Sequence, residues 1–311
     1  MNARRVGAAV ALVLLAAFMA WFFIPTLSND RQASDPKVSG VARASRSPHM
    51  ASVVRKPSAP DFVSLAVREI ESSSDLRASY EKYKSASDGQ ILFRLSNIID
   101  DCHHFAEKSA DQISREMNGW RGKEMKSLPR RLAIERQIQR CSGFKGWPLT
   151  EAVRALQMRA VQLDHPAAIA SYLMLLPMRG WVDQGDAEAI RLLSEGNLDG
   201  DVIWGIYLYL DARNGDSWRY QFGDPTVNTA AWVLLRCNYG GTCDQNSHFV
   251  FMACIYYAAC EQTDAASALP HVYPDLTPEK FAEAVRIQSI LASHVENRDW
   301  VRLGFSKQET K

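Results

Sequence analysis

The sequence lacks the short motifs that mark several common classes of catalytic site. It contains no G-x-S-x-G, H-E-x-x-H or C-x-x-C motif and no phosphate-binding G-x-x-x-x-G-K-[ST] loop. Carboxylate pairs such as Glu279 and Glu283 are present, but paired acids for glycan hydrolysis are defined by their geometry, which the sequence does not give. We therefore predict a protein that is not an enzyme and carries no cofactor, with a cell-wall-acting enzyme as an alternative.

The sequence also lacks an excess of charge of either sign. Its 36 basic and 35 acidic residues leave a formal net charge of +1 over 311 residues. A chain without a strong global field gives no indication of binding nucleic acid or an acidic substrate. The local basic stretch from Arg121 to Arg140 is interpreted as a solvated helical face, and contact with an acidic partner is the alternative.

The N-terminal region predicts a membrane anchor. Arg4 and Arg5 precede an apolar run from Val6 to Ile24 that contains no charged residue. A run of about nineteen residues reaches across roughly 30 Å of hydrocarbon and is longer than the core of most signal peptides. The two arginines favour a cytoplasmic N-terminus. We expect residues 1–27 to be a single-pass inner-membrane anchor, and a cleaved signal peptide ending before Asn29 is the alternative.

The polar segment that follows predicts a linker. Residues 28–60 are rich in Ser, Ala, Pro and Arg and show no apolar periodicity, which is typical of a disordered tether. The remainder, residues 61–311, would then lie outside the inner membrane, in the periplasm if the cell is a Gram-negative bacterium.

The cysteines indicate disulfides rather than a metal. Their even number and patterned spacing are typical of an oxidising compartment, and they are Cys102, Cys141, Cys237, Cys243, Cys254 and Cys260. Cys102 and Cys141 each lie late in an apolar helical segment, so we predict that they pair with each other. The run Asp100-Asp101-Cys102-His103-His104 is the densest set of possible zinc ligands. Adjacent side chains on a helix point about 100° apart, however, so the run cannot converge on one ion.

The stretch from Trp232 to Gln262 is a short internal repeat. Two apolar segments are each followed by C-x-Y-x-x-x-C-[DE]-Q, and Cys237 and Cys243 recur seventeen residues later as Cys254 and Cys260. We predict that each unit closes its own disulfide, because Gly240-Gly241 can turn the chain back in the first unit. The second unit has no glycine there. Its helix must end soon after Cys254, since six helical residues would separate the cysteines by about 9 Å and 240°.

The rest of the chain predicts an all-α array of short antiparallel helices. No segment shows sustained β alternation, and apolar residues recur at helical spacing between breaks of Gly, Asp, Asn or Pro. Asp88 and Thr150 are candidate N-caps. Beyond the short apolar face of residues 62–70, we expect helices over residues 90–107, 132–141, 151–164, 167–178, 186–194 and 202–210.

One pair of segments resembles a known repeat family. D-H-P-A-A-I-A-S-Y-L at 164–173 can be laid on D-G-D-V-I-W-G-I-Y-L at 199–208, 35 residues later, with 187–193 as the helix between them. This is similar to the Sel-one-like repeats, which are shorter relatives of tetratricopeptide repeats. The resemblance implies a degenerate helical solenoid used for protein contacts.

Aromatic residues gather after the second of these segments. Trp204 and Tyr207 lie at helical spacing and are expected in the core. Trp218, Tyr220 and Phe222 are candidates for a binding surface, and closure of a loop over the core is the alternative.

Together these features predict a membrane-anchored periplasmic helical-repeat protein that acts in protein interaction or scaffolding in the bacterial envelope. A binder or inhibitor of an envelope-acting enzyme is a second hypothesis. A deep cleft with two convergent carboxylates of raised pKa would instead favour a cell-wall enzyme.

Overall fold

The computed structural model describes residues 62–121, 127–196, 198–215, 218, 220, 223–245 and 247–305. The chain divides into two units, residues 1–56 and 57–311, and all of the described structure belongs to the second unit. The predicted anchor from Val6 to Ile24, the predicted linker 28–60 and Phe222 lie outside the described residues. Within the described ranges, every helix is too short or too polar to cross a membrane.

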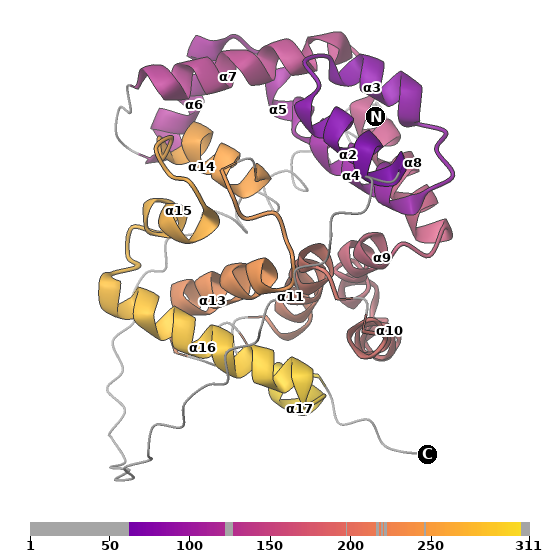
Figure 1. The fold of residues 1–311 in the computed structure, drawn as a ribbon, viewed down its shortest axis with the longest axis vertical. Helices are drawn as coiled ribbons and strands as arrows, with labels where there is room; N and C mark the ends of the chain where they lie inside the picture. Colours follow the sequence, from indigo (N-terminus) through magenta and orange to yellow (C-terminus); the bar gives the residue numbers. More distant parts are fainter. Residues whose placement is uncertain are drawn as a thin grey trace, which may run out of the picture. The chain divides into compact units, whose positions relative to one another are not determined.

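The prediction of an all-α fold is confirmed for this part of the chain, where no strand forms and the one β-bridge is isolated (Figure 1). The first helices are α2 (Phe62–Ser72), α3 (Leu76–Tyr83), α4 (Gly89–Asp100), α5 (Cys102–Phe105), α6 (Ala110–Arg121), α7 (Leu128–Cys141), the 3-10 turn η1 (Ser142–Phe144) and α8 (Leu149–Gln162). They are followed by α9 (Pro166–Leu173), the 3-10 turn η2 (Pro177–Arg179), α10 (Val182–Ser194), α11 (Gly200–Asn214), α13 (Pro225–Asn238), α14 (His248–Tyr257), α15 (Ala265–Val272), α16 (Pro278–Glu296) and α17 (Trp300–Leu303).

Short polar side chains set where several helices begin. The carboxylate of Asp88 accepts hydrogen bonds from the backbone N–H groups of Gln90 and Ile91, so the predicted cap is confirmed. The predicted cap at Thr150 is wrong. The carbonyl of Pro148 already accepts a helical hydrogen bond from the N–H of Ala152, and α8 therefore begins at Leu149, before Thr150.

Most of the described helices pack around one large apolar core. The helices α4, α9, α11 and α13 follow one another in a row, α8 covers α4 and α9, and α10 covers α9 and α11. The long helix α16 packs along α13, as Figure 1 shows in yellow and orange. Among the described residues, the larger of two clusters of buried apolar side chains extends from Ala66 to Phe305, so these helices share one core.

All three predicted disulfides are confirmed. Cys102 pairs with Cys141 at a Cα–Cα distance of 5.2 Å. The first repeat unit closes between Cys237 and Cys243, with Cα atoms 5.6 Å apart, and the second closes between Cys254 and Cys260 at 4.1 Å.

The second unit turns without a glycine. The helix α14 ends at Tyr257, and Ala258 adopts a left-handed backbone with φ of 56°. The N–H of Ala258 still reaches the carbonyl of Cys254, and the chain then reverses and brings Cys260 back beside the helix. The helix therefore ends within the disulfide loop, as the pairing requires.

Candidate binding pocket at the starts of three helices

The two segments that match at an offset of 35 residues form neighbouring helices. Ala170 of α9 and Gly205 of α11 occupy equivalent positions in the match, and they meet in the structure. A Cβ atom added to Gly205 would lie 2.6 Å from the Ala170 Cβ. Only a glycine allows this approach, so the small residues at the matched positions set how closely α9 and α11 pack.

A third copy of this segment lies at the start of α4 and was missed by the sequence analysis. Asp88-Gly89-Gln90-Ile91-Leu92-Phe93 matches Asp199-Gly200-Asp201-Val202-Ile203-Trp204 in the pattern D-G-x-[IV]-[LI]-[FW]. The Asp-Gly dipeptide before an apolar run was the available signal. The 111-residue separation hid it, because that interval is not a multiple of the 35-residue offset. In the structure Gly89 lies against His165, the residue that precedes α9.

A cavity of about 140 Å³ opens where the starts of these three helices meet the turn that follows α13. We call it the repeat-edge pocket. Its lining residues are Gln90, Phe93, Arg94, His165, Asp199, Gly200, Asp201, Gly240, Gly241 and Thr242.

One wall of the repeat-edge pocket is formed by glycine backbone without side chains. A Cβ atom added to Gly200 would lie 2.4 Å from the Gly241 Cα, and Gly240 has a left-handed backbone with φ of 79°. The Gly-Gly pair predicted to turn the first repeat unit therefore also brings that unit against the start of α11.

A chain of ion pairs crosses the pocket. The Arg94 guanidinium lies 3.3 Å from a Glu71 carboxylate oxygen and 3.6 Å from Asp201. Arg236 of α13 donates to the other oxygen of Asp201 at 2.6 Å. Two cations and two carboxylates alternate, so this chain is balanced in charge and holds Arg94 and Asp201 in place.

The imidazole of His165 lies beside the pocket with its hydrogen-bonding groups unused. Its ring packs on Phe93 with centroids 5.4 Å apart, and within the described part of the chain its nitrogens have no hydrogen-bond partner. Burial lowers the pKa of the His165 imidazole. The ring is therefore mainly neutral at pH 7 and offers one N–H donor and one nitrogen acceptor beside the cavity.

Negative charge predominates around His165. The carboxylates of Asp88, Asp199 and Asp201 all favour a positive charge there and oppose the lowering of the His165 pKa by burial. Arg94 is the cation that acts against them. The repeat-edge pocket thus combines a neutral imidazole, excess carboxylate charge and bare backbone.

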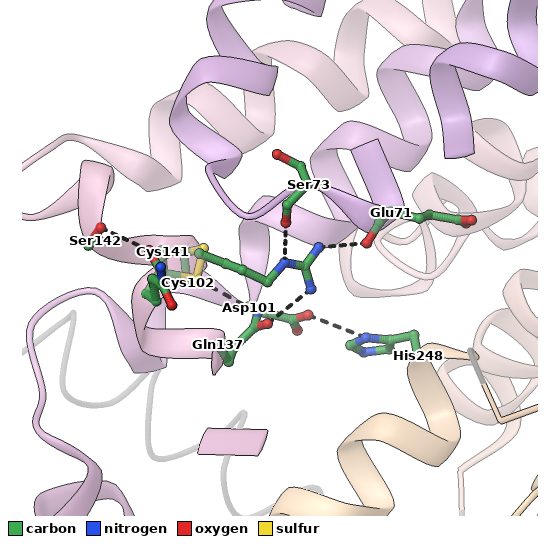
Figure 2. Close-up of a disulfide and its surroundings, with 10 residues drawn as sticks. Glu71, Ser73, Asp101, Cys102, Gln137, Cys141, Ser142 and His248 are labelled. Atoms are coloured by element: carbon green, nitrogen blue, oxygen red, sulfur yellow. Dashed lines mark hydrogen bonds and ion pairs between the residues drawn. A yellow bond between two sulfur atoms is a disulfide. The ribbon is translucent and has the colours of Figure 1, made fainter. Parts of the chain in front are cut away.

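A second polar cluster surrounds the disulfide between Cys102 and Cys141 (Figure 2). Asp101 immediately precedes Cys102, and one oxygen of its carboxylate lies 3.3 Å from Nδ1 of His248. Burial raises the pKa of Asp101 to about 6. Because Cys102 is bonded to Cys141, its sulfur is not available to a metal. Among the described residues no group of three or more His, Cys, Asp or Glu side chains is placed to hold an ion.

Of the three aromatic candidates for a binding surface, Trp218 lies in the core, which agrees with the alternative of a loop closed over the core. Its side chain is 4% exposed, and its indole N–H donates to the Leu303 carbonyl at 3.3 Å. Its ring packs against Tyr207 and Trp232 in the core. Of the other two candidates, Tyr220 is 51% exposed, and Phe222 lies outside the described residues.

Comparison of the chain with protein-family models, with curated proteins and with solved structures gives no match. The arguments for function therefore rest on the residues and geometry described above.

Proposed function

We propose that this chain is a membrane-anchored, periplasmic helical-repeat protein that binds a protein partner in the bacterial envelope through the repeat-edge pocket. The observation that carries the proposal is the partly buried His165 beside a polar cavity, with both ring nitrogens unpaired among the described residues. These nitrogens lie beside the cavity, so a ligand placed there can supply a hydrogen-bond partner to each of them.

The arrangement of the helices supports a binding role. Repeated helix pairs stack into extended surfaces, and equivalent residues of successive repeats line the same side of the stack. Here the pocket uses equivalent positions of matched segments, with Gln90 and Asp201 at the third position and His165 and Gly200 at the second. The resemblance to Sel-one-like repeats, which serve protein contacts, agrees with this proposal.

Size and charge together point to one positively charged side chain of the partner. Pockets for whole small molecules commonly measure about 300–1,000 Å³. A cavity of about 140 Å³ is better matched to the end of a single side chain. The ion-pair chain balances Asp201, but the carboxylates of Asp88 and Asp199 add negative charge around His165, so a lysine or arginine of the partner suits the site.

The disulfides support the proposed location. The six cysteines form three disulfides, and no cysteine remains free. Disulfides form and persist mainly in oxidising compartments, which include the bacterial periplasm. The anchor itself is proposed from the apolar run between Val6 and Ile24.

An enzymatic role is less well supported. Burial raises the pKa values of both Asp100 and Asp101, which are adjacent carboxylates. They lie at the junction of α4 and α5, however, and neither lines the repeat-edge pocket. Structural ion-pair contacts also perturb pKa values, and the contact of Asp101 with His248 is of this kind.

Site-specific photocrosslinking in intact cells tests the proposal. A photoreactive residue at Gln90 or at Thr242, both exposed at the pocket, should capture the same partner. The control position is Val285 of α16, which is 41% exposed and does not line the pocket. A His165→Ala change should abolish capture at both pocket positions. Equal capture from position 285, or capture that persists with His165→Ala, would contradict the proposed site.

A further inference from the structure

The junction between α14 and the N-terminal helices includes two polar contacts. The helix α14 packs on α7, where Nε of Arg130 donates to the Ile255 carbonyl at 2.7 Å. At the start of α14, His248 faces Asp101 across 3.3 Å. Figure 2 shows this pair, with the histidine on the orange helix and the aspartate beside the disulfide. The two residues are far apart in sequence, so the contact exists only while α14 is docked.

Asp101 is held in place on the side away from α14. The disulfide from Cys102 to Cys141 ties the residue after Asp101 to the last residue of α7. The Asp101 side chain is 17% exposed, whereas His248 is 50% exposed. Since the backbone beside Asp101 is fastened, release of its carboxylate to water requires movement of α14 rather than of α5.

The charged groups around Asp101 come from three elements. Asp100 of α4 repels its negative charge, while Arg140 of α7 and His248 of α14 attract it. The Tyr256 hydroxyl of α14 also faces Asp101. Arg140 is already occupied, because its guanidinium donates to the carbonyls of Ser73 and Glu71 at 2.7 and 2.9 Å. Burial raises the pKa values of both Asp100 and Asp101, that of Asp101 to about 6, so Asp101 changes protonation in mildly acidic to neutral conditions.

We propose that the contact between Asp101 and His248 is a proton-sensitive clasp, which holds α14 firmly on α5 and α7 in mildly acidic conditions and loosens towards neutral pH. At low pH, Asp101 is protonated, and burial of the neutral carboxyl costs little desolvation free energy. As the pH rises, the ionised carboxylate must stay in a poorly solvated place, which disfavours the docked state.

The direction follows from the sign of the shift. Burial raises the pKa of Asp101 from its ordinary value of 3.8 to about 6. A group with a raised pKa in the docked state stabilises that state below its ordinary pKa, and this stabilisation is lost as the pH rises through about 6. If undocking returns Asp101 to its ordinary pKa, opening of α14 should become roughly twentyfold more frequent between pH 4.5 and 7.5.

Hydrogen exchange of the disulfide-bonded protein tests the clasp. Protection of the α14 amides, corrected for intrinsic exchange rates, should fall roughly twentyfold between pH 4.5 and pH 7.5. Asp101→Asn should remove most of this dependence, and His248→Gln should lower protection near pH 6. The matched control is His294→Gln, which removes a histidine 3.8 Å from Asp299 in another part of the fold and should leave α14 unchanged.

Two outcomes would overturn the clasp. One is equal pH dependence of α14 protection in wild type and Asp101→Asn. The other is an NMR titration of the wild-type Asp101 carboxyl that gives an ordinary pKa near 4, a measurement that needs no variant and so remains decisive if Asp101→Asn fails to fold.

Discussion

The two seventeen-residue units share the pattern C-x-Y-x-x-x-C-[DE]-Q and the same disulfide spacing, but they turn the chain by different means. In the first unit the left-handed residue is Gly240, with φ of 79°, and in the second it is Ala258, with φ of 56°. Glycine adopts this backbone without strain, whereas for alanine it costs about 1–2 kcal/mol. The second turn is therefore maintained by its surroundings, of which the disulfide is the nearest.

The units also differ in what they pack against. The helix α13 of the first unit lies between α11 and α16, and Trp232 and Leu235 are buried there. In the second unit, Phe249 and Met252 occupy the matching positions and are only partly buried. The helix α14 contacts α7 and α15 and shares a small separate apolar cluster with α15. The same local pattern thus serves a central helix in one unit and a peripheral helix in the other.

The largest effect is expected where the first unit meets α11. Gly200→Ala would place a Cβ atom 2.4 Å from the Gly241 Cα, so two backbone segments must separate, at an expected cost of about 3 kcal/mol or more in the free energy of unfolding. Denaturant titration measures it. Gly119→Ala, which meets no atom within 4 Å, is the control and should be neutral or slightly stabilising. Tolerance of Gly200→Ala would show that the first unit is as weakly supported as the second.

A pH effect is expected at the helix of the second unit. Because burial raises the pKa of Asp101 from 3.8 to about 6, ionised Asp101 should destabilise the fold by at most about 3 kcal/mol at pH 7.5 relative to pH 4. Carboxylates with lowered pKa values, such as Asp224, change stability in the opposite direction. The difference in unfolding free energy between wild type and Asp101→Asn isolates the Asp101 contribution and should shift in favour of the variant as the pH rises.

Removal of each local disulfide should reduce the free energy of unfolding by a different amount in the two units. Both loops span six positions, so the chain-entropy model predicts the same loss of about 2 kcal/mol for Cys237→Ala/Cys243→Ala and Cys254→Ala/Cys260→Ala. Without its disulfide, however, the second unit can relax Ala258 and extend α14. Its loss should therefore be smaller by about 1 kcal/mol. Equal losses in denaturant titrations would mean that packing, rather than the disulfide, maintains Ala258.

The smallest effects are expected from exchanging the turn residues. Gly240→Ala should destabilise the protein by about 1 kcal/mol, because no atom lies within 4 Å of the added Cβ and only backbone strain contributes. Ala258→Gly should stabilise it by about 0.5 kcal/mol, since relief of strain is partly offset by the greater freedom of glycine in the unfolded chain. Thermal unfolding of both variants checks the pair. The same sign for both changes would contradict the account of the two turns.

The sequence by itself determined the local features of this protein. Helical spacing and the absence of β alternation predicted an all-α fold, and Asp88 was identified as a cap from its position before an apolar run. The pairings of Cys237 with Cys243 and of Cys254 with Cys260 were also predictable, because six residues and one turn limit where each cysteine can reach. The anchor and the linker remain predictions, since they lie outside the described residues.

Only the tertiary structure decided the sites. The repeat-edge pocket needs Gly89, His165 and Gly200 to meet, and their contact depends on how closely the helices pack rather than on local pattern. Burial of Trp218 depends on the distant carbonyl of Leu303. The raised pKa of Asp101 likewise requires α14 to be docked beside it. Burial and electrostatic field are sums over neighbours brought together by folding, so residues next to one another in sequence do not reveal them.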